Sequence, residues 1–334
     1  MDFRHVVRDV QFRPESDDFT VSVTDLRGKI DKEEIFSHVI VAIGTFSFPN
    51  IPDFAGIETF EGRILHSKDF KDAHEFKGAS ILIIGGNFSA SEIAIQLIKY
   101  GTSSRIICSS KTASIRIDQV PKEIEQRLLP ERIDKHIVTF KDGSSASVDV
   151  IIFCTGYIYH YPFLRGNLRF DIEGQKSNLY PAGLYKGTVC IKGGNNKLFH
   201  IAACETYLNF QAWDIQAIWI VKYILEELTS EPVSNEIMIK EAFEWEKAAA
   251  DVVGPFETLA FMRDFTKYLC KDIEYPEKYI DKGHELVVDC LKGRLSNLCG
   301  YRDDCMANMF TGEVAPSHHT KWIDCLDESV DLYL

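Results

Sequence analysis

The first half of the chain is built from short apolar runs separated by polar or glycine-containing segments. Residues 19–24 alternate between apolar and polar side chains, which is the pattern of a half-buried strand. Residues 39–42 and 81–84 are continuous apolar runs of strand length, which favours strands that are buried on both faces. The pattern therefore predicts a sheet-rich first half.

One strand–turn–helix–strand unit follows the run 81–84. That run stops at Gly85, and apolar residues then recur four positions apart over residues 90–100, as on one face of a helix. The apolar run 106–108 predicts the next strand. Two strands joined by a helix over so short a stretch predict a βαβ unit and hence a parallel sheet.

The second half changes from strands to helices. The runs 137–140 and 148–153 predict two further strands. Residues 215–225 are apolar nearly all round, which indicates a buried helix, and residues 235–271 are amphipathic and helical. The remainder, rich in Cys, His and Asp, is expected to be irregular. Strands alternating with helices predict the α/β class.

Composition narrows the class of protein. With 334 residues, 45% of them hydrophobic, the chain can bury a large core in two domains or one large α/β unit. A formal net charge of −13 disfavours nucleic acid as a partner. No apolar run is long enough to span a bilayer, and the N-terminus lacks a signal-peptide core. The nine cysteines form no Cys-x-x-Cys pair and no zinc spacing. We therefore expect a cytoplasmic protein with reduced thiols and no metal.

The turn after residue 84 is the first candidate site. Its residues stand between a strand and a helix, where a dinucleotide fingerprint belongs: Gly85, Gly86, Asn87, Phe88, Ser89 and Ala90. Glycine permits the tight turn, and free N–H groups at the helix start face a pyrophosphate. Asn87 stands where the second fingerprint glycine is usual, and Ala90 where the third is. An ordinary strand-to-helix turn remains the alternative.

The end of the next strand indicates which dinucleotide would bind. NAD sites usually place a carboxylate about 20 residues beyond the glycine turn, on the ribose hydroxyls. This chain instead has a lysine with hydroxyl neighbours: Ser109, Ser110, Lys111 and Thr112. These residues suit a 2′-phosphate and favour NADP(H). The alternative is that Lys111 is a solvated surface lysine.

A second motif carries a family resemblance. Residues 60–70 read F-x-G-x-x-x-H-x-x-x-F, formed by Phe60, Gly62, His66 and Phe70. This motif resembles the identifying motif of flavin-containing monooxygenases, with Phe70 in place of the tryptophan that marks Baeyer–Villiger enzymes. Gly62 allows a tight bend, and we expect His66 to tie this linker to the domain junction by hydrogen bonds. We interpret His66 as architectural rather than as an acid or base.

Other segments match the same family in the same order. Residues 41–44 followed by 49–52 resemble its ATG strand end and proline loop, although Ile43 replaces the usual threonine. Thr155, Gly156 and Tyr157 resemble its second strand end, the TGY element. Residues 315–322 and 326–329 resemble the C-terminus of the bacterial enzymes that oxidise trimethylamine. The adjacent His318 and His319 are expected to be structural, because neighbouring side chains in an extended segment point opposite ways.

The resemblance implies a fold and an activity. It implies a two-dinucleotide-binding flavoprotein, with a Rossmann-like NADP domain at residues 77–151 inserted into a truncated FAD domain at 1–76 and 152–334. It implies that NADPH reduces FAD, that O2 forms a C4a-hydroperoxyflavin, and that a small amine or sulfide takes one oxygen at nitrogen or sulfur. No side-chain acid or base is required, so none is assigned a catalytic role. A homodimer is compatible with the resemblance.

The chain also departs from the family. No second glycine fingerprint exists, and nothing before residue 39 matches, so we expect a fragment or a truncated form that holds FAD poorly. The alternative function is a catalytically inactive truncated homologue that binds NADP(H) or a partner. Phe88 replaces a tyrosine that lies beside the flavin and NADP in the trimethylamine enzymes. Residues 204–214 align with a stretch that lines the flavin and substrate pocket, where Asp214 and the following Gln216 match but the usual Gln and Trp do not.

Overall fold

The computed structural model describes residues 3–101, 103–112, 120–169, 179–301, 307–308 and 311–314. The predicted tail motif at 315–329, including His318 and His319, lies outside them. The chain divides into two compact units. Unit 1 comprises Met1–Phe48 and Ile158–Val288, and unit 2 comprises Pro49–Tyr157 and Asp289–Leu334. The cofactor-domain limits of 77 and 151 stay a prediction.

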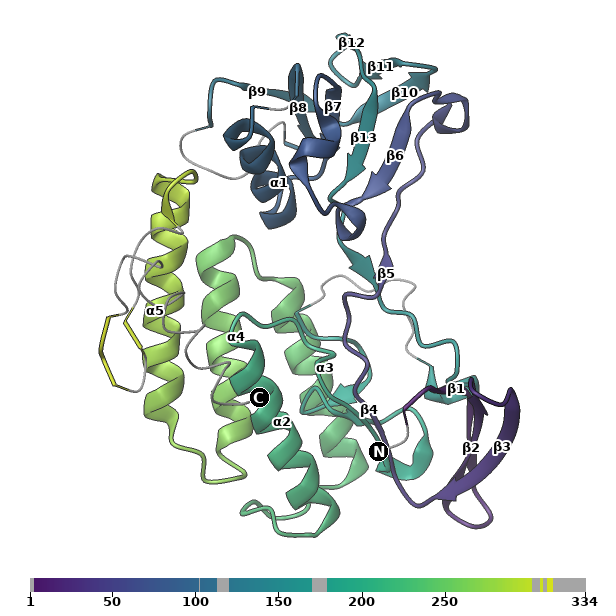
Figure 1. The fold of residues 1–334 in the computed structure, drawn as a ribbon. Helices are drawn as coiled ribbons and strands as arrows, with labels where there is room; N and C mark the ends of the chain where they lie inside the picture. The colour runs from purple at the N-terminus through teal and green to yellow at the C-terminus, as the bar shows by residue number, and fades with distance from the viewer. Residues whose placement is uncertain are drawn as a thin grey trace, which may run out of the picture. The chain divides into compact units, whose positions relative to one another are not determined.

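Unit 2 is organised around a five-stranded parallel sheet (Figure 1). Its strands, in spatial order, are β6 (Arg63–His66), β13 (Val150–Phe153), β7 (Ser80–Ile84), β8 (Arg105–Ser110) and β9 (Ile124–Leu128). The apolar run of β7 lies at the centre, and all four of its isoleucine and leucine side chains are fully buried. Continuous apolar runs are what a sheet covered on both faces requires.

Each face of this sheet has its own cover. Helix α1 (Phe88–Lys99) packs Ile93 and Leu97 against one face, together with Ile81 and Ile83 of β7. A three-stranded antiparallel sheet covers the other face: β10 (Pro130–Asp134), β11 (Ile137–Phe140) and β12 (Ser145–Ser147). The predicted βαβ unit is therefore present, and its strands are parallel.

Unit 1 contains two smaller sheets. An antiparallel sheet is formed by β1 (His5–Arg13), β2 (Asp18–Asp25) and β3 (Ile30–Phe36). A four-stranded sheet has the order β15 (Leu184–Tyr185), β16 (Val189–Cys190), β17 (Leu198–His200) and β4 (Val39–Val41). Strand β4 pairs in parallel with β17 and forms the edge of that sheet. Val10, Phe19 and Leu198 belong to the core that these sheets share.

Helices make up the rest of unit 1, and three expectations need correction. Helix α2 (Asn209–Ile224) begins six residues before the apolar run that predicted it. The single helical stretch expected over 235–271 is two helices, α3 (Asn235–Ala250) and α4 (Pro255–Cys270), because Gly254 adopts a positive φ of 97° and Pro255 begins a new helix. None of the helices among the described residues is long and apolar enough to cross a membrane.

The segment expected to be irregular contains a 20-residue helix, α5 (Glu277–Ser296). Its residues up to Val288 belong to unit 1, and those from Asp289 belong to unit 2. Gly283 and Gly293 lower its intrinsic helix propensity, which hides it from a propensity argument. Burial of one face, at Ile280 and Leu291, stabilises it instead. Two short strands, β5 (Phe48–Pro49) and β14 (Tyr157–Ile158), pair where the chain passes between the units.

Candidate functional site

The glycine turn of unit 2 is confined by both neighbouring strands. Gly85 has φ 140°, and its N–H donates to the carbonyl of Ser109 at 2.9 Å. A Cβ at this position would lie 2.3 Å from the carbonyl oxygen of Cys154. Any side chain would therefore collide with the backbone that follows β13. The sequence needs glycine here for space as well as for conformation.

The start of α1 leaves backbone donors for a ligand. The helix begins after Asn87, whose side chain makes no capping hydrogen bond. Gly86 is partly exposed, and Asn87 and Ser89 are exposed. Ala90 is fully buried in the core beneath the helix, so a methyl group fits where the fingerprint usually has its third glycine. Uncapped N–H groups and the positive end of the helix dipole suit a pyrophosphate, so the turn fits a dinucleotide.

The end of β8 lies beside this turn, but its residues differ in what they can offer. Ser109 is fully buried and its hydroxyl donates to the carbonyl of Leu128 at 2.8 Å. Ser110 is also buried, whereas Lys111 and Thr112 are exposed. Lys111 and Thr112 are therefore the members of the predicted group whose polar ends can reach a phosphate directly. Ser109 can act only by holding β8 against β9.

Packing explains the spacing of the F-x-G-x-x-x-H-x-x-x-F motif. A Cβ on Gly62 would lie 2.2 Å from the carbonyl oxygen of Asp149 and 2.6 Å from the ring of Phe60. Phe70 stacks on Phe76 with ring centroids 5.4 Å apart and planes at 6°. Phe60 and Phe70 thus fix the two ends of a segment that delivers β6 to the edge of the parallel sheet.

His66, the centre of the motif, bridges two backbone segments. Its Nδ1 accepts from the N–H of Lys68 at 3.2 Å, and its Nε2 lies 3.0 Å from the carbonyl of Gly156. An accepting Nδ1 and a donating Nε2 are the two atoms of one neutral tautomer. Burial lowers the pKa of His66, although the bond to Gly156 opposes that shift. The geometry therefore matches the architectural role inferred from the sequence.

The TGY element meets the proline loop at the same carbonyl. Gly156 has φ 78°, and its carbonyl also accepts the N–H of Asn50 at 2.9 Å. The hydroxyl of Thr155 donates to the carbonyl of Asn50, and the ring of Tyr157 meets His66 edge-on with centroids 5.0 Å apart. Thr155, Gly156 and Tyr157 are therefore placed together with His66, and their polar groups serve the junction.

Sequence reasoning missed one charged residue at the glycine turn. The guanidinium of Arg294, from α5, lies 4.0 Å from the ring centroid of Phe88 and donates to the hydroxyl of Ser91. Glu92 lies 3.9 Å from the same guanidinium. Arg294 is only 4% exposed. A polar residue at a buried position of a helix was the available signal, but it required knowing that α5 exists.

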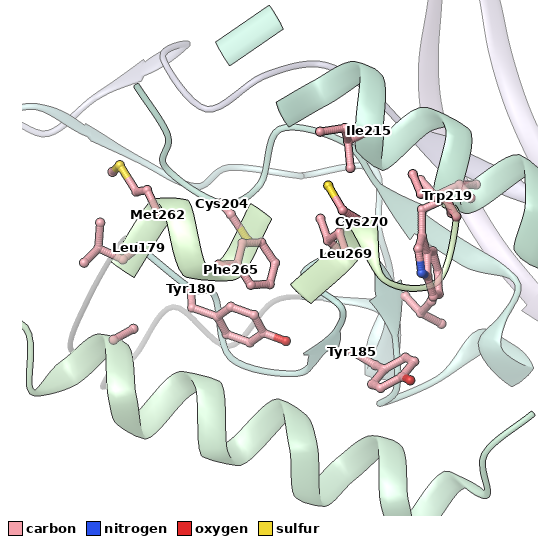
Figure 2. Close-up of a cluster of buried hydrophobic side chains, with 14 of the residues drawn as sticks. Leu179, Tyr180, Tyr185, Cys204, Ile215, Trp219, Met262, Phe265, Leu269 and Cys270 are labelled. Carbon is pink, nitrogen blue, oxygen red and sulfur yellow. The ribbon is translucent and has the colours of Figure 1, made fainter. Parts of the chain in front are cut away.

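The segment aligned with the family's pocket lining borders a small cavity in unit 1. Cys204, Glu205 and Thr206 line it, with residues of α2 and α4 opposite. Figure 2 shows Cys204 beside Phe265 within this buried cluster. Gln216 is buried and accepts from the N–H of Ala202 at 3.0 Å, whereas Asp214 is exposed. Burial raises the pKa of the Glu205 carboxyl.

Residues for a flavin are less complete than those for NADP(H). The strand end after β4 includes Gly44, which has φ 72° and open space around it. Within the described residues of unit 1, no strand passes through a glycine turn into a helix. The described residues therefore offer a strand end for FAD but no second pyrophosphate cradle. Nor do three His, Cys, Asp or Glu side chains gather as a metal site in the part of the chain that the structure describes.

Comparisons with known proteins agree on the family. Residues 124–278 match the family described as flavin-binding monooxygenase-like, and residues 7–182 match the pyridine nucleotide-disulphide oxidoreductase family. The chain is 36% identical to a trimethylamine monooxygenase of Methylocella silvestris over 99% of this chain and 71% of that protein. It is 33% identical to the trimethylamine monooxygenase of Roseovarius nubinhibens over 99% of this chain and 72% of that protein.

A solved structure extends the likeness to three dimensions. The crystal structure of Tmm from Pelagibacter sp. strain HTCC7211 superposes with a TM-score of 0.84 at 28% identity, covering 94% of this chain and 69% of that one. The predicted α/β, two-dinucleotide architecture is thereby confirmed. The chain belongs to the flavin-containing monooxygenase family, whose enzymes work with FAD and NADP(H).

Proposed function

We propose that this chain binds NADP(H) at the Gly85 turn and takes part in the oxygenation of a small amine or sulfide by O2 at nitrogen or sulfur. The names of the bacterial relatives support an amine as the first substrate to test. Sulfides remain in the proposal because a soft sulfur nucleophile accepts oxygen by the same chemistry. The departures at Phe88 and in residues 204–214 prevent copying the substrate of the relatives directly.

The observation that carries the proposal is the confinement of Gly85. A Cβ there would overlap the carbonyl of Cys154, so the turn leaves the backbone of α1 bare at the ends of three adjacent parallel strands. Dinucleotides bind at such strand ends in open α/β sheets. Lys111 and Thr112 stand exposed at the end of β8, where the ribose and its 2′-phosphate would lie. Gly86, Asn87, Phe88, Ser89 and Ala90 complete the proposed cofactor contact.

The protein's own part in the reaction is to bind, orient and dry the site. FAD, when bound, supplies the redox and oxygen chemistry. The N–H groups after Gly85 hold the nicotinamide dinucleotide, and Arg294 fixes the ring of Phe88 over the same turn. The apolar wall beside Cys204 excludes water from its cavity. No proton transfer by a side chain is assigned.

A second candidate function is NADP(H) binding without flavin. It is favoured by one observation: β4 forms a sheet edge, and the described residues of unit 1 hold no glycine turn between a strand and a helix. Tight FAD binding in such folds depends on backbone donors at a helix start. The two candidates agree on NADP(H) and differ only on flavin.

The deciding experiment supplies the purified chain with excess FAD and NADPH and then offers trimethylamine or dimethyl sulfide. Oxygenated product, identified by mass spectrometry and matched to NADPH consumed, is the expected result. The control is the Gly85→Ala variant, which should consume little NADPH. NADPH binding without product at saturating FAD would favour the flavin-free candidate.

A further inference from the structure

A buried ion pair lies in unit 1 outside the residues discussed so far. The amine of Lys186 is 2.7 Å from Oδ2 of Asp272, and the two residues are only 4% and 7% exposed. The same carboxylate oxygen accepts the indole N–H of Trp219 at 2.9 Å. Burial lowers the pKa of the Lys186 amine, although Asp272 opposes that shift. Removing charges from water at such a site is costly unless the pair has a role or excellent geometry.

Aromatic groups complete the surroundings of the pair. The amine of Lys186 lies 3.4 Å from the ring centroid of Tyr268 on α4, and the hydroxyl of Tyr268 donates to Glu241 on α3. The pair and its neighbours thus come from the β15–β16 turn, α2, α3, α4 and the segment after α4. One lysine side chain therefore joins the four-stranded sheet to three helices.

The turn that carries Lys186 leads directly to the cavity wall. Lys186 and Gly187 have positive φ values of 53° and 61°, and a positive φ is uncommon for a lysine. A Cβ on Gly187 would lie 2.6 Å from Sγ of Cys204 and 2.8 Å from the ring of Phe265. Gly187 also receives the hydroxyl of Tyr180 on its N–H at 3.2 Å. The turn is therefore pressed against two residues that line the cavity.

We propose that Lys186, through its ion pair with Asp272, is a positioning residue that holds the β15–β16 turn against Cys204 and so sets the wall formed by Cys204, Glu205 and Thr206. The assignment of that wall to the substrate pocket rests on the proposed function. The holding of the wall does not. An apolar residue at position 186 could fill the space, but only a charged pair of fixed geometry holds the turn in its left-handed conformation.

The test measures how fast iodoacetamide alkylates Cys204, read by peptide mass spectrometry. Burial raises the pKa of this thiol, so alkylation of the native protein is slow. Lys186→Met should raise the rate at Cys204 at least tenfold and leave Cys108, which is buried in unit 2, unchanged. Gly187→Ala keeps the ion pair but pushes on Cys204, so it should raise the same rate.

Two controls separate positioning from stability. Lys267→Met removes an ion pair of the same type, 2.6 Å from Asp281, elsewhere in unit 1, and should leave Cys204 alkylation unchanged. The double variant Lys186→Met with Asp272→Leu removes both buried charges, which often costs little stability. It should melt close to the parent protein while Cys204 stays reactive.

Cys204 reactivity that rises together with that of Cys108, or that follows melting temperature across all variants, would overturn the proposal. So would slow alkylation in Lys186→Met. In a preparation that turns over, the same variant should raise the KM for the amine more than it lowers kcat, and an unchanged KM with a lower kcat would count against a positioning role. Because alkylation needs no activity, failure of the proposed function would leave this test intact.

Discussion

The two sheets that face the cofactor question in this chain are built to different degrees of completion. In unit 2, β7 is the central strand of five, its apolar side chains are fully buried, and it runs through Gly85 into α1. In unit 1, β4 is an edge strand of three residues, its Ile40 is 45% exposed, and Gly44 follows it without a helix. A glycine at a strand end is therefore not sufficient for a phosphate cradle, because the helix that supplies the N–H groups must follow it.

The largest expected effect concerns flavin. We predict that the chain as given retains little FAD after gel filtration, since its described residues offer no second cradle. A fusion that places the first strand–turn–helix–strand segment of the Methylocella silvestris relative ahead of Met1 should retain close to one FAD per chain. Absorbance of the eluted protein measures both. Stoichiometric FAD on the unfused chain would show that β4 and Gly44 suffice.

That fusion should also change self-association. An exposed parallel edge such as β4 invites pairing with another chain. The unfused chain is expected to elute partly as aggregates, and the fusion mainly as a single species of defined size. Light scattering during the same gel filtration reports the difference. Equal aggregation of both forms would mean that β4 is not the adhesive edge.

The next effect concerns the turn in unit 2. Gly85→Ala places a methyl group against the carbonyl of Cys154 and should abolish measurable NADPH binding. It should also lower the free energy of unfolding by about 1–3 kcal/mol, the scale of a strained backbone position. Gly143→Ala is the control, because Gly143 also has a positive φ of 81° but open space around it. Equal loss of binding in both variants would refute the steric argument.

A smaller effect is expected at the end of β8. Loss of one charge-assisted contact costs about 1.5–3 kcal/mol, so Lys111→Ala should weaken NADPH binding roughly tenfold or more and leave NADH nearly unchanged. Lys99→Ala, at the far end of α1, is the matched control. Isothermal titration with both cofactors measures the difference. A parallel loss for NADH would remove Lys111 from the 2′-phosphate.

The smallest effect is a change in pH dependence. The pKa of His66 is lowered in the folded protein, so between that value and the unfolded value the unfolded chain binds more protons. The stability from His66 is therefore complete above about pH 6.5 and lost as the pH falls. His66→Ala should cost about 0.5–1.5 kcal/mol near pH 7.5 for its hydrogen bonds, and less at pH 5.5.

Denaturant titrations at the two pH values provide that measurement, with His74→Ala as the control. His74 is exposed and pairs only with the nearby Asp72. Where turnover can be measured, His66→Ala should lower the pH–rate profile without removing a limb. A missing limb would show that His66 transfers a proton.

Local patterns in the sequence determined much of unit 2. The apolar run before Gly85, the four-residue repeat after it and the run in β8 each report an element through its own residues, so the βαβ unit and its turn could be predicted. The same holds for His66, whose spacing in the motif indicated a tie that the structure places on Gly156. Signals of this kind survive because the residues that form the contact also form the pattern.

The tertiary structure alone decided the features that depend on distant partners. Helix α5 contains two glycines and is stabilised by burial of Ile280 and Leu291 rather than by propensity. Arg294 reaches Phe88 across about 200 residues of sequence, as its bond to Ser91 shows, and Lys186 meets Asp272 only because a sheet and three helices converge. A lone charge in a sequence indicates solvent by default. Its burial becomes visible only when the chain has brought its partner to it.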